Sequence, residues 1–396
     1  MKMKEVKTTT IMLLLSFSLS FVSCKHRSVH EIVDSTDVSV IKYKSEDGHV
    51  LLRDSVVKRS GFIKLDTDSI CLIGKIDQLL FTDSVIIVVD QNIARSVLIF
   101  DMRGHFVSKV SSLGNGPKEY IMLKHVFLTS DKKEVAIYDM IKGKILLYDL
   151  KGNYKSTISC KDRYNGIESI DSETWALDLQ GTSGLSTESF NGYAFGVADK
   201  DFNPLFAFGK NIFSKDLNIS RLREIYSFGG NVYFNVGWEN TIYQLTKDSV
   251  LEKYRLVYEE DDSVDVDKEF TTNEEFDLYT KDHPVFNGEF IELKDYTYIS
   301  YLSHSQKPFL LFDHKTGVTY SVSQGETSFL LWFMERPIAR YGENTLVECV
   351  SSTKVFALKD FLYSFFGSSS ELDKLYDNLT PDSNPILFLY DIDIKH

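Results

Sequence analysis

Two stretches of this chain are close copies of each other, 48 positions apart. Residues 96–106 read SVLIFDMRGHF, and residues 144–154 read KILLYDLKGNY. Each copy is preceded by a second run of strand-forming residues that ends in an aspartate, Asp90 or Asp139. A unit this short cannot bury its own apolar face, so it must stack against further copies of itself. The repeat therefore restricts the fold to an array of similar units.

The Asp-x-x-Gly motif in each copy predicts a tight turn between two strands. An aspartate at the first position of a type I turn accepts backbone N–H groups, and a glycine at the fourth position adopts a positive φ without strain. Gly104 and Gly152 occupy that fourth position. Each unit is therefore expected to be a meander of antiparallel strands. Weaker copies of the unit lie at 193–203, 231–256 and 309–317. The fourth unit of the series, at 231–256, lacks the turn glycine.

The number of units follows from the length of the chain. Residues 40–396 include two stretches that do not read as strands, 259–290 and 358–384, and the remainder corresponds to about six units. Four-stranded antiparallel sheets arranged radially form a β-propeller, which leaves only short, protected edges. We therefore predict an all-β, six-bladed β-propeller with short helical insertions. Two separate sandwiches are the alternative, which the lack of a Pro/Gly/Ser-rich linker disfavours.

Both non-strand stretches contain helical patterns. The first stretch, 259–290, begins with an acidic run at 259–269. The carboxylates of this run could hold calcium, although the run lacks the central glycine and the spaced ligands of an EF-hand. Solvated surface is the favoured interpretation of that run. The second stretch places four apolar residues at helical spacing, so we expect a helix packed on the outside or the end of the propeller. These residues are Leu372, Leu375, Tyr376 and Leu379.

The N-terminus has the layout of a bacterial export signal. A basic start with three lysines is followed by an apolar run, 11–22, that is too short to span a bilayer as a mature helix. The signal peptide is expected to comprise residues 1–23. Cys24 follows directly, so residues 24–39 would form a tether and residues 40–396 the propeller.

The segment around Cys24 resembles the lipobox of bacterial lipoproteins, with Phe21 at the position of the usual leucine. That resemblance implies lipidation of Cys24 and contact with the membrane through the lipid alone. An ordinary signal peptide followed by an incidental cysteine is the alternative. Removing residues 1–23, which carry three lysines and one glutamate, changes the net charge from −13 to −15. Nucleic acid is therefore not an expected partner, because no basic stripe with interleaved aromatics is present.

The remaining cysteines, Cys71, Cys160 and Cys349, are far apart and odd in number. One pair could form a disulfide in an oxidising compartment, but the spacing indicates neither a metal site nor a disulfide framework. The favoured interpretation is that all three cysteines are small, buried, apolar residues of the core.

Several segments together resemble the six-bladed β-propeller lipoproteins of Bacteroidetes, which are related to NHL-repeat propellers. Besides the two repeats, these segments are GNGPKEY at 114–120, NTIY at 240–243 with Lys253 and Tyr254, and DSNPIL at 382–387. The resemblance implies the propeller fold and a location in the cell envelope, and it transfers no catalytic residue. Basic residues at 25–27, where some surface-exposed lipoproteins carry acidic ones, favour an anchor that faces the periplasm.

No catalytic motif stands out, since the chain has no Gly-x-Ser-x-Gly elbow, His-Glu-x-x-His helix or paired-cysteine zinc spacing. The loop 114–120 is most simply a connector between blades, with its glutamate capping neighbouring backbone. The inner strands of a propeller can nevertheless bring residues of several blades together at the channel mouth. Candidates for that position, each also explained by a structural role, are Glu119, Tyr120, His125, Glu168 and Trp238.

Two functional classes remain open. The first is a lipid-anchored binding or scaffolding module for a protein, a peptide or a glycan, without cofactor, metal or chemistry of its own. The second is a hydrolase or lyase that uses a divalent cation in the central channel. We favour the first class, because the sequence does not identify a set of carboxylates and histidines for the second.

Overall fold

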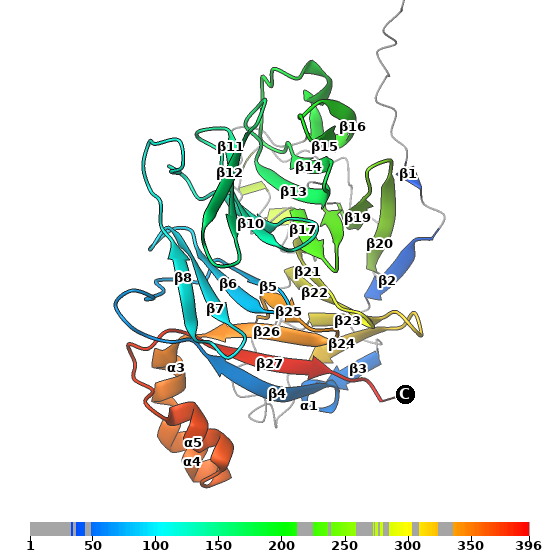
Figure 1. Ribbon diagram of the computed structural model, residues 1–396. Coiled ribbons are helices and arrows are strands. Elements are labelled where there is room, and N and C mark those ends of the chain that lie inside the picture. The colour runs from blue at the N-terminus through cyan, green and yellow to red at the C-terminus, as the bar shows by residue number, and fades with distance from the viewer. Residues whose placement is uncertain are drawn as a thin grey trace, which may run out of the picture.

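The computed structural model describes residues 33–34, 37–43, 49–211, 225–236, 239–258, 272, 274–275, 278–279, 285–302, 309–323 and 336–395. Within these residues, the strands form six separate, mainly antiparallel sheets arranged as a ring (Figure 1). The six-bladed β-propeller expected from the 48-residue repeat is therefore confirmed. The predicted signal peptide, Cys24 and the acidic run 259–269 lie outside the described residues.

Each of the first three blades is a meander of four consecutive strands. Blade 1 contains β5 (Gln78–Phe81), β6 (Val85–Asp90), β7 (Ser96–Asp101) and β8 (Phe106–Val110). Blade 2 contains β9 (His125–Leu128), β10 (Glu134–Asp139), β11 (Lys144–Asp149) and β12 (Tyr154–Ser159). Blade 3 contains β13 (Gly166–Asp171), β14 (Thr174–Asp178), β15 (Tyr193–Asp199) and β16 (Pro204–Lys210), with a 3₁₀ turn η1 (Glu188–Phe190).

The other three blades include strands from the N-terminal segment. Blade 4 contains β17 (Ile225–Phe228), β18 (Asn231–Phe234), β19 (Thr241–Leu245) and β20 (Val250–Tyr258), with β1 (Val33–Asp34) and β2 (Ser39–Tyr43) on its edge. Blade 5 contains β21 (Val285–Glu292), β22 (Tyr296–Leu302), β23 (Phe309–Asp313), β24 (Thr319–Ser323) and β3 (His49–Leu52). Blade 6 contains β25 (Ala339–Tyr341), β26 (Thr345–Val350), β27 (Ile386–Ile392) and β4 (Val57–Lys64), which follows helix α1 (Arg53–Val56).

The turns between the third and fourth strands of blades 1 and 2 have the predicted chemistry. The Asp101 carboxylate accepts the backbone N–H groups of the turn, and Gly104 and Gly152 have φ values of 90° and 80°. In blade 3 the equivalent glycine is replaced by Phe202, which still adopts a φ of 60°. Its buried ring stacks on Trp175 with 5.8 Å between the centroids, so packing holds a backbone conformation that phenylalanine rarely adopts.

Both faces of the second and third strands of each repeat are buried, as expected for sheets that pack face to face. Every residue of β6 is buried, and Ile87 and Ile99 of blade 1 share a core cluster with Ile137 and Leu146 of blade 2. The core therefore lies between neighbouring blades, which explains why a single repeat cannot fold alone.

The ring is closed by strands from opposite ends of the chain. β4 pairs antiparallel with β27, so that Phe62 lies opposite Phe388. Before that, β1 and β2 pair parallel with β20, and β3 pairs parallel with β24. The segment 33–64 thus follows the edges of three consecutive blades. Part of the predicted tether, 24–39, is therefore strand, and the sheets begin before residue 40.

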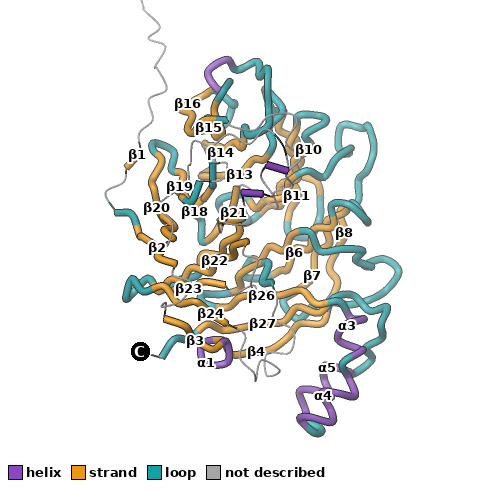
Figure 2. Tube along the Cα trace, turned by 180° about the vertical axis from the view of Figure 1, so that it is seen from behind, coloured by secondary structure: helices purple, strands orange, loops and turns teal. Residues whose placement is uncertain are grey.

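The predicted excursion 358–384 is helical but begins earlier, at Ser352, and the predicted excursion 259–290 must be shortened. Helices α3 (Ser352–Ala357), α4 (Lys359–Phe366) and α5 (Ser370–Tyr376) project together from one corner of the molecule (Figures 1 and 2). The four apolar residues expected on one helical face are all buried. Residues 285–290, in contrast, belong to strand β21. A register shift between Phe286 and Phe290, with Gly288 at a φ of 82°, interrupts the alternating pattern by which strands are recognised.

Candidate functional site

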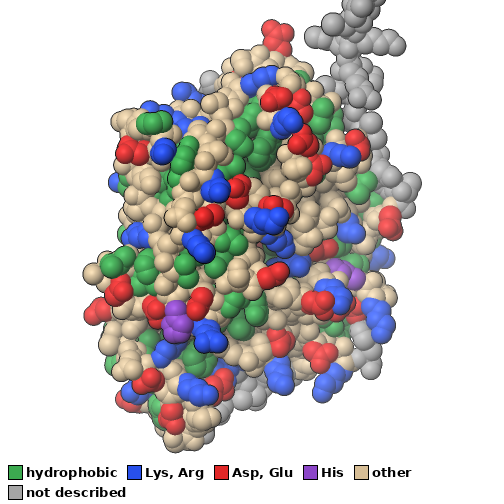
Figure 3. All heavy atoms as spheres, in the orientation of Figure 1, with side chains coloured by type: hydrophobic (Ala, Val, Ile, Leu, Met, Phe, Trp, Pro, Cys, Tyr) green, Lys and Arg blue, Asp and Glu red, His purple; other side chains and the backbone are tan. Residues whose placement is uncertain are grey.

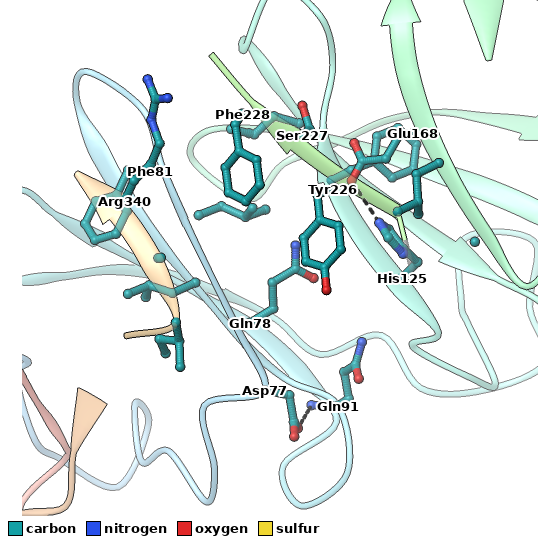
Figure 4. Close-up of a pocket in the computed structure, with 18 of the residues that line it drawn as sticks. Asp77, Gln78, Phe81, Gln91, His125, Glu168, Tyr226, Ser227, Phe228 and Arg340 are labelled. Atoms are coloured by element: carbon teal, nitrogen blue, oxygen red, sulfur yellow. Dashed lines mark hydrogen bonds and ion pairs between the residues drawn. The ribbon is translucent and has the colours of Figure 1, made fainter. Parts of the chain in front are cut away.

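The first strands of all six blades line one central cavity of about 1660 Å³. These strands are β5, β9, β13, β17, β21 and β25, and Figure 4 shows side chains from several of them pointing into the space between the blades. Because every blade has the same strand order, the six first strands start at one end of the cavity and finish at the other. We call the end where they start the upper mouth and the other end the lower mouth.

A buried aspartate joins two loops at the upper mouth of blade 1. Asp90 ends strand β6 and is fully buried. Its Oδ2 accepts the backbone N–H groups of Gly74 (2.8 Å) and Lys75 (3.0 Å), and its Oδ1 accepts those of Ile93 (3.0 Å) and Ala94 (2.9 Å). One carboxylate therefore fixes both the loop that enters the blade and the loop between its second and third strands.

Blade 2 repeats this arrangement. Asp139 ends strand β10 and is also fully buried. Its Oδ2 accepts the N–H of Ile121 at 2.8 Å, and its Oδ1 accepts the N–H groups of Met122 at 3.3 Å and Ile141 at 3.1 Å. The two aspartates that end the second strands of blades 1 and 2 thus hold the loops of these blades at the channel entrance.

The loops held by these aspartates carry large apolar side chains on the surface. Ile93 is 63% exposed, and Ile121, Met122 and Ile141 are 38–40% exposed. We call these four residues the apolar collar; the last three also line the cavity. Single exposed apolar residues are common on protein surfaces, but here four lie on loops of two neighbouring blades at the same mouth, and buried carboxylates fix their backbone. The collar is therefore a preformed apolar surface.

Basic side chains accompany the collar. Arg95 and Lys124 line the cavity, and neither forms an ion pair with a carboxylate in the described part of the chain. Lys75 is already paired with Asp77 at 2.6 Å. Figure 3 shows one face of the molecule, on which acidic and basic side chains are interspersed. Two basic side chains without an ion pair among the described residues therefore lie beside the collar.

Two of the residues proposed from the sequence meet in the wall of the channel. His125 on β9 and Glu168 on β13 come from neighbouring blades, and their Nε2 and Oε1 atoms lie 3.0 Å apart (Figure 4). Both side chains are buried, with 9% and 1% of their surface exposed. Burial limits the access of a ligand to either group. The contact therefore has a structural role, which is to link blade 2 to blade 3.

The next two candidates lie in the loop between blades 1 and 2, and neither is among the residues that line the cavity. Glu119 accepts the backbone N–H of Gly116 at 2.8 Å, which matches the capping role considered as the structural alternative. Tyr120 is fully buried, and its hydroxyl donates to the carbonyl oxygen of Arg95 at 2.7 Å. Burial raises the pKa of Tyr120, so the hydroxyl remains a donor. Trp238 lies outside the described residues.

The collar and the role of the two aspartates were not identified from the sequence. The sequence shows that Asp90 and Asp139 end the buried strands, but it does not show which backbone groups their carboxylates accept. The recognisable signal is an aspartate that ends a fully apolar strand and is followed within three residues by a large apolar residue, here Ile93 or Ile141.

Metal-binding and thiol chemistry have no assembled site in the part of the chain that the structure describes. No group of three or more His, Cys, Asp or Glu side chains is placed there to hold a metal ion. Cys71, Cys160 and Cys349 are free thiols. Burial raises the pKa of both Cys160 and Cys349 to about 12, which disfavours the reactive thiolate form.

Comparison with known proteins supports the fold. The family model "Domain of unknown function (DUF4934)" matches residues 37–391. A crystal structure titled "Putative exported protein" from Bacteroides fragilis superposes with a TM-score of 0.73 at 19% identity, covering 89% of this chain and 99% of that one. A DUF4221 family member from Bacteroides vulgatus reaches a TM-score of 0.48 at 8% identity, covering 86% and 99%. The search of curated proteins found no match.

In the described ranges, no helix is both long and apolar enough to cross a membrane.

Proposed function

The chain belongs to the family of domain DUF4934, and from the geometry of its upper mouth we propose that it is a non-catalytic binding module of the cell envelope. Its ligand is an acidic peptide segment with large apolar side chains, presented by a protein partner. The observation that carries the proposal is the apolar collar, whose backbone is fixed by the buried Asp90 and Asp139.

A peptide fits the collar better than a glycan does. Burying a fully exposed isoleucine or methionine side chain stabilises a complex by about 1.5–3 kcal/mol. Ile93, which is 63% exposed, can contribute most of such a gain, and the other three collar residues a smaller part of it. Because the loops are already held in place, the protein itself loses little conformational entropy on binding. Arg95 and Lys124 would attract acidic side chains. The collar contains no aromatic side chain on which a sugar ring could stack.

The proposal is tested with a library of 12-residue peptides displayed on phage and selected against the chain from residue 24 onward, with Cys24→Ser. We expect the selected peptides to combine Asp or Glu with Leu, Ile or Phe. A synthetic peptide with a selected sequence should bind at least tenfold more weakly to the variant Ile93→Asp/Ile121→Asp/Ile141→Asp, as measured by fluorescence anisotropy. The substituted side chains are exposed, so the melting temperature should change little.

The matched control is Val107→Asp/Leu205→Asp. Both residues are exposed to a similar degree as the collar, but they lie on the outermost strands β8 and β16. This control should bind the peptide like the parent chain. Equal binding by the collar variant, or a library that yields only basic peptides, would refute the proposal.

We also propose that the chain is a lipoprotein, attached through Cys24 with the propeller facing the periplasm and related to NHL-repeat propellers. The lipobox-like segment and the basic residues after it support this location. Cells that express the full chain and are fed a labelled fatty acid should incorporate the label and retain the protein in the membrane fraction. Cys24→Ser should abolish the label and release the protein; an unlabelled parent chain would exclude the anchor.

A further inference from the structure

Arg340 occupies an unusual position at the lower mouth of the channel. It lies on β25, the first strand of blade 6, lines the cavity and is half buried (Figure 4). Its Nη1 donates to the backbone carbonyl oxygen of Glu292 at 2.7 Å. The other guanidinium N–H groups have no partner among the described residues, and they are not closed off from solvent. Arg340 therefore retains free donors that face accessible space.

Three other arginines of the described chain form ion pairs, whereas Arg95 at the opposite mouth forms none. These pairs are Arg59 with Glu371, Arg255 with Glu252 and Arg336 with Glu289. Arg340 forms no ion pair within the described ranges. Burial lowers the pKa of its guanidinium, and the negative charge of the nearby Glu292 raises it. The Glu292 carboxylate is engaged elsewhere, since it accepts the hydroxyl of Tyr254 at 2.8–2.9 Å. A half-buried guanidinium without a bound carboxylate has donors available for an external one.

The surroundings of Arg340 are aromatic and open. Phe81 and Tyr341 line the same part of the cavity, with 5.4 Å between their ring centroids, and Phe228 lines it from blade 4. Gly229, at a φ of 60°, has no side chain next to the guanidinium; a Cβ there would lie 3.5 Å from Nη1 of Arg340. The backbone thus leaves space beside the charge, and the walls around it are apolar.

We propose that the lower mouth is a second binding site, which takes a carboxylate carried on an aromatic or aliphatic body. The carboxylate binds the free edge of the Arg340 guanidinium, and the body packs against Phe81, Tyr341 and Phe228. This site is separate from the collar, at the opposite end of the channel, and does not depend on the peptide proposal.

The charge balance selects a singly charged ligand. Arg340 is close to the carboxylate of Glu292, and Asp83 also lines the lower part of the cavity. A phosphate dianion would meet this negative charge with a single guanidinium to offset it, whereas a carboxylate carries one charge and matches the planar fork of arginine.

The probes are 3-phenylpropanoate, its amide, the peptide Gly-Gly-Phe with a free or amidated C-terminus, and inorganic phosphate, each titrated calorimetrically into the chain from residue 24 with Cys24→Ser. At least one free carboxylate should bind, while its amide and phosphate should not. Binding of the free acid alone identifies a small-molecule site, and binding of the free peptide alone identifies a C-terminus site. Either result supports the proposal.

Variants test whether Arg340 is responsible. Arg340→Gln should weaken the bound carboxylate at least tenfold, and the control Arg336→Gln, which removes a charge from the same cavity, less than threefold. If Arg340→Gln unfolds, Arg340→Lys retains the charge and should still weaken binding, because lysine cannot form the two-pronged contact. Unchanged affinity in Arg340→Lys and Arg340→Gln, binding of the amides, or failure of every carboxylate to bind would overturn the proposal.

Discussion

Replacing Glu168 by leucine should lower the free energy of unfolding by about 3 kcal/mol, because the imidazole of His125 would lose its carboxylate partner inside the channel wall. Replacing both residues, as His125→Leu/Glu168→Leu, should cost less than the sum of the two single changes. Apolar side chains of similar size can pack in place of a buried polar pair. Urea unfolding of the four proteins of this double-mutant cycle measures the difference, which should exceed 1 kcal/mol.

Glu173→Leu is the control for this experiment, since Glu173 lies in the same blade but forms only an exposed ion pair with Lys200. Its change should stay within about 0.5 kcal/mol. Strictly additive effects of the two buried changes would show that the pair does not tie the blades together. A divalent cation that the parent chain retains after dialysis and the double variant lacks would instead favour the metal-dependent hydrolase or lyase.

Phe388→Ala should lower the free energy of unfolding by about 3–5 kcal/mol, as measured by urea denaturation. Phe388 is fully buried on β27, and its ring centroid lies 6.2 Å from that of Phe62 on β4. The substitution leaves a cavity at the junction where the two ends of the chain close the ring. Amide hydrogen exchange should therefore accelerate in β4 and in β27 together.

The matched control for ring closure is Phe361→Ala on helix α4, where the phenylalanine is 43% exposed. This change should cost less than about 1 kcal/mol. Equal losses from the two phenylalanine substitutions would contradict the role of the β4–β27 junction in closing the propeller.

The fold was predictable because its main determinants are local. The Asp-x-x-Gly turns and the fully apolar runs such as 85–89 specify a meander, and the 48-residue period specifies the number of blades. Two details were not predictable. Phe202 takes the place of a turn glycine because buried rings hold its backbone, and strand β21 is interrupted by Gly288. Both depend on tertiary packing that a single sequence does not display.

The site was less predictable than the fold. His125 and Glu168 could be named as candidates from their place on the first strands, but their contact depends on how far neighbouring blades rotate about the axis. The collar was missed because its isoleucines look like ordinary core residues. Only the structure shows that Asp139 accepts the backbone N–H groups of Ile121 and Ile141 and that both side chains are partly exposed. Arg340 was missed for a similar reason, since the sequence does not reveal whether an arginine has a carboxylate partner.

The most direct test of the binding proposal places a photo-crosslinking amino acid in the full chain within living cells. The crosslinker replaces Ile93 or Ile141 in the collar, and Val107 or Leu205 on the outer strands in matched controls. Irradiation should yield one discrete protein adduct from both collar positions and none from the outer strands, and the adduct should disappear when Ile121→Asp is added. Adducts from the outer strands with none from the collar would contradict the proposal that this propeller binds its partner at the upper mouth of the channel.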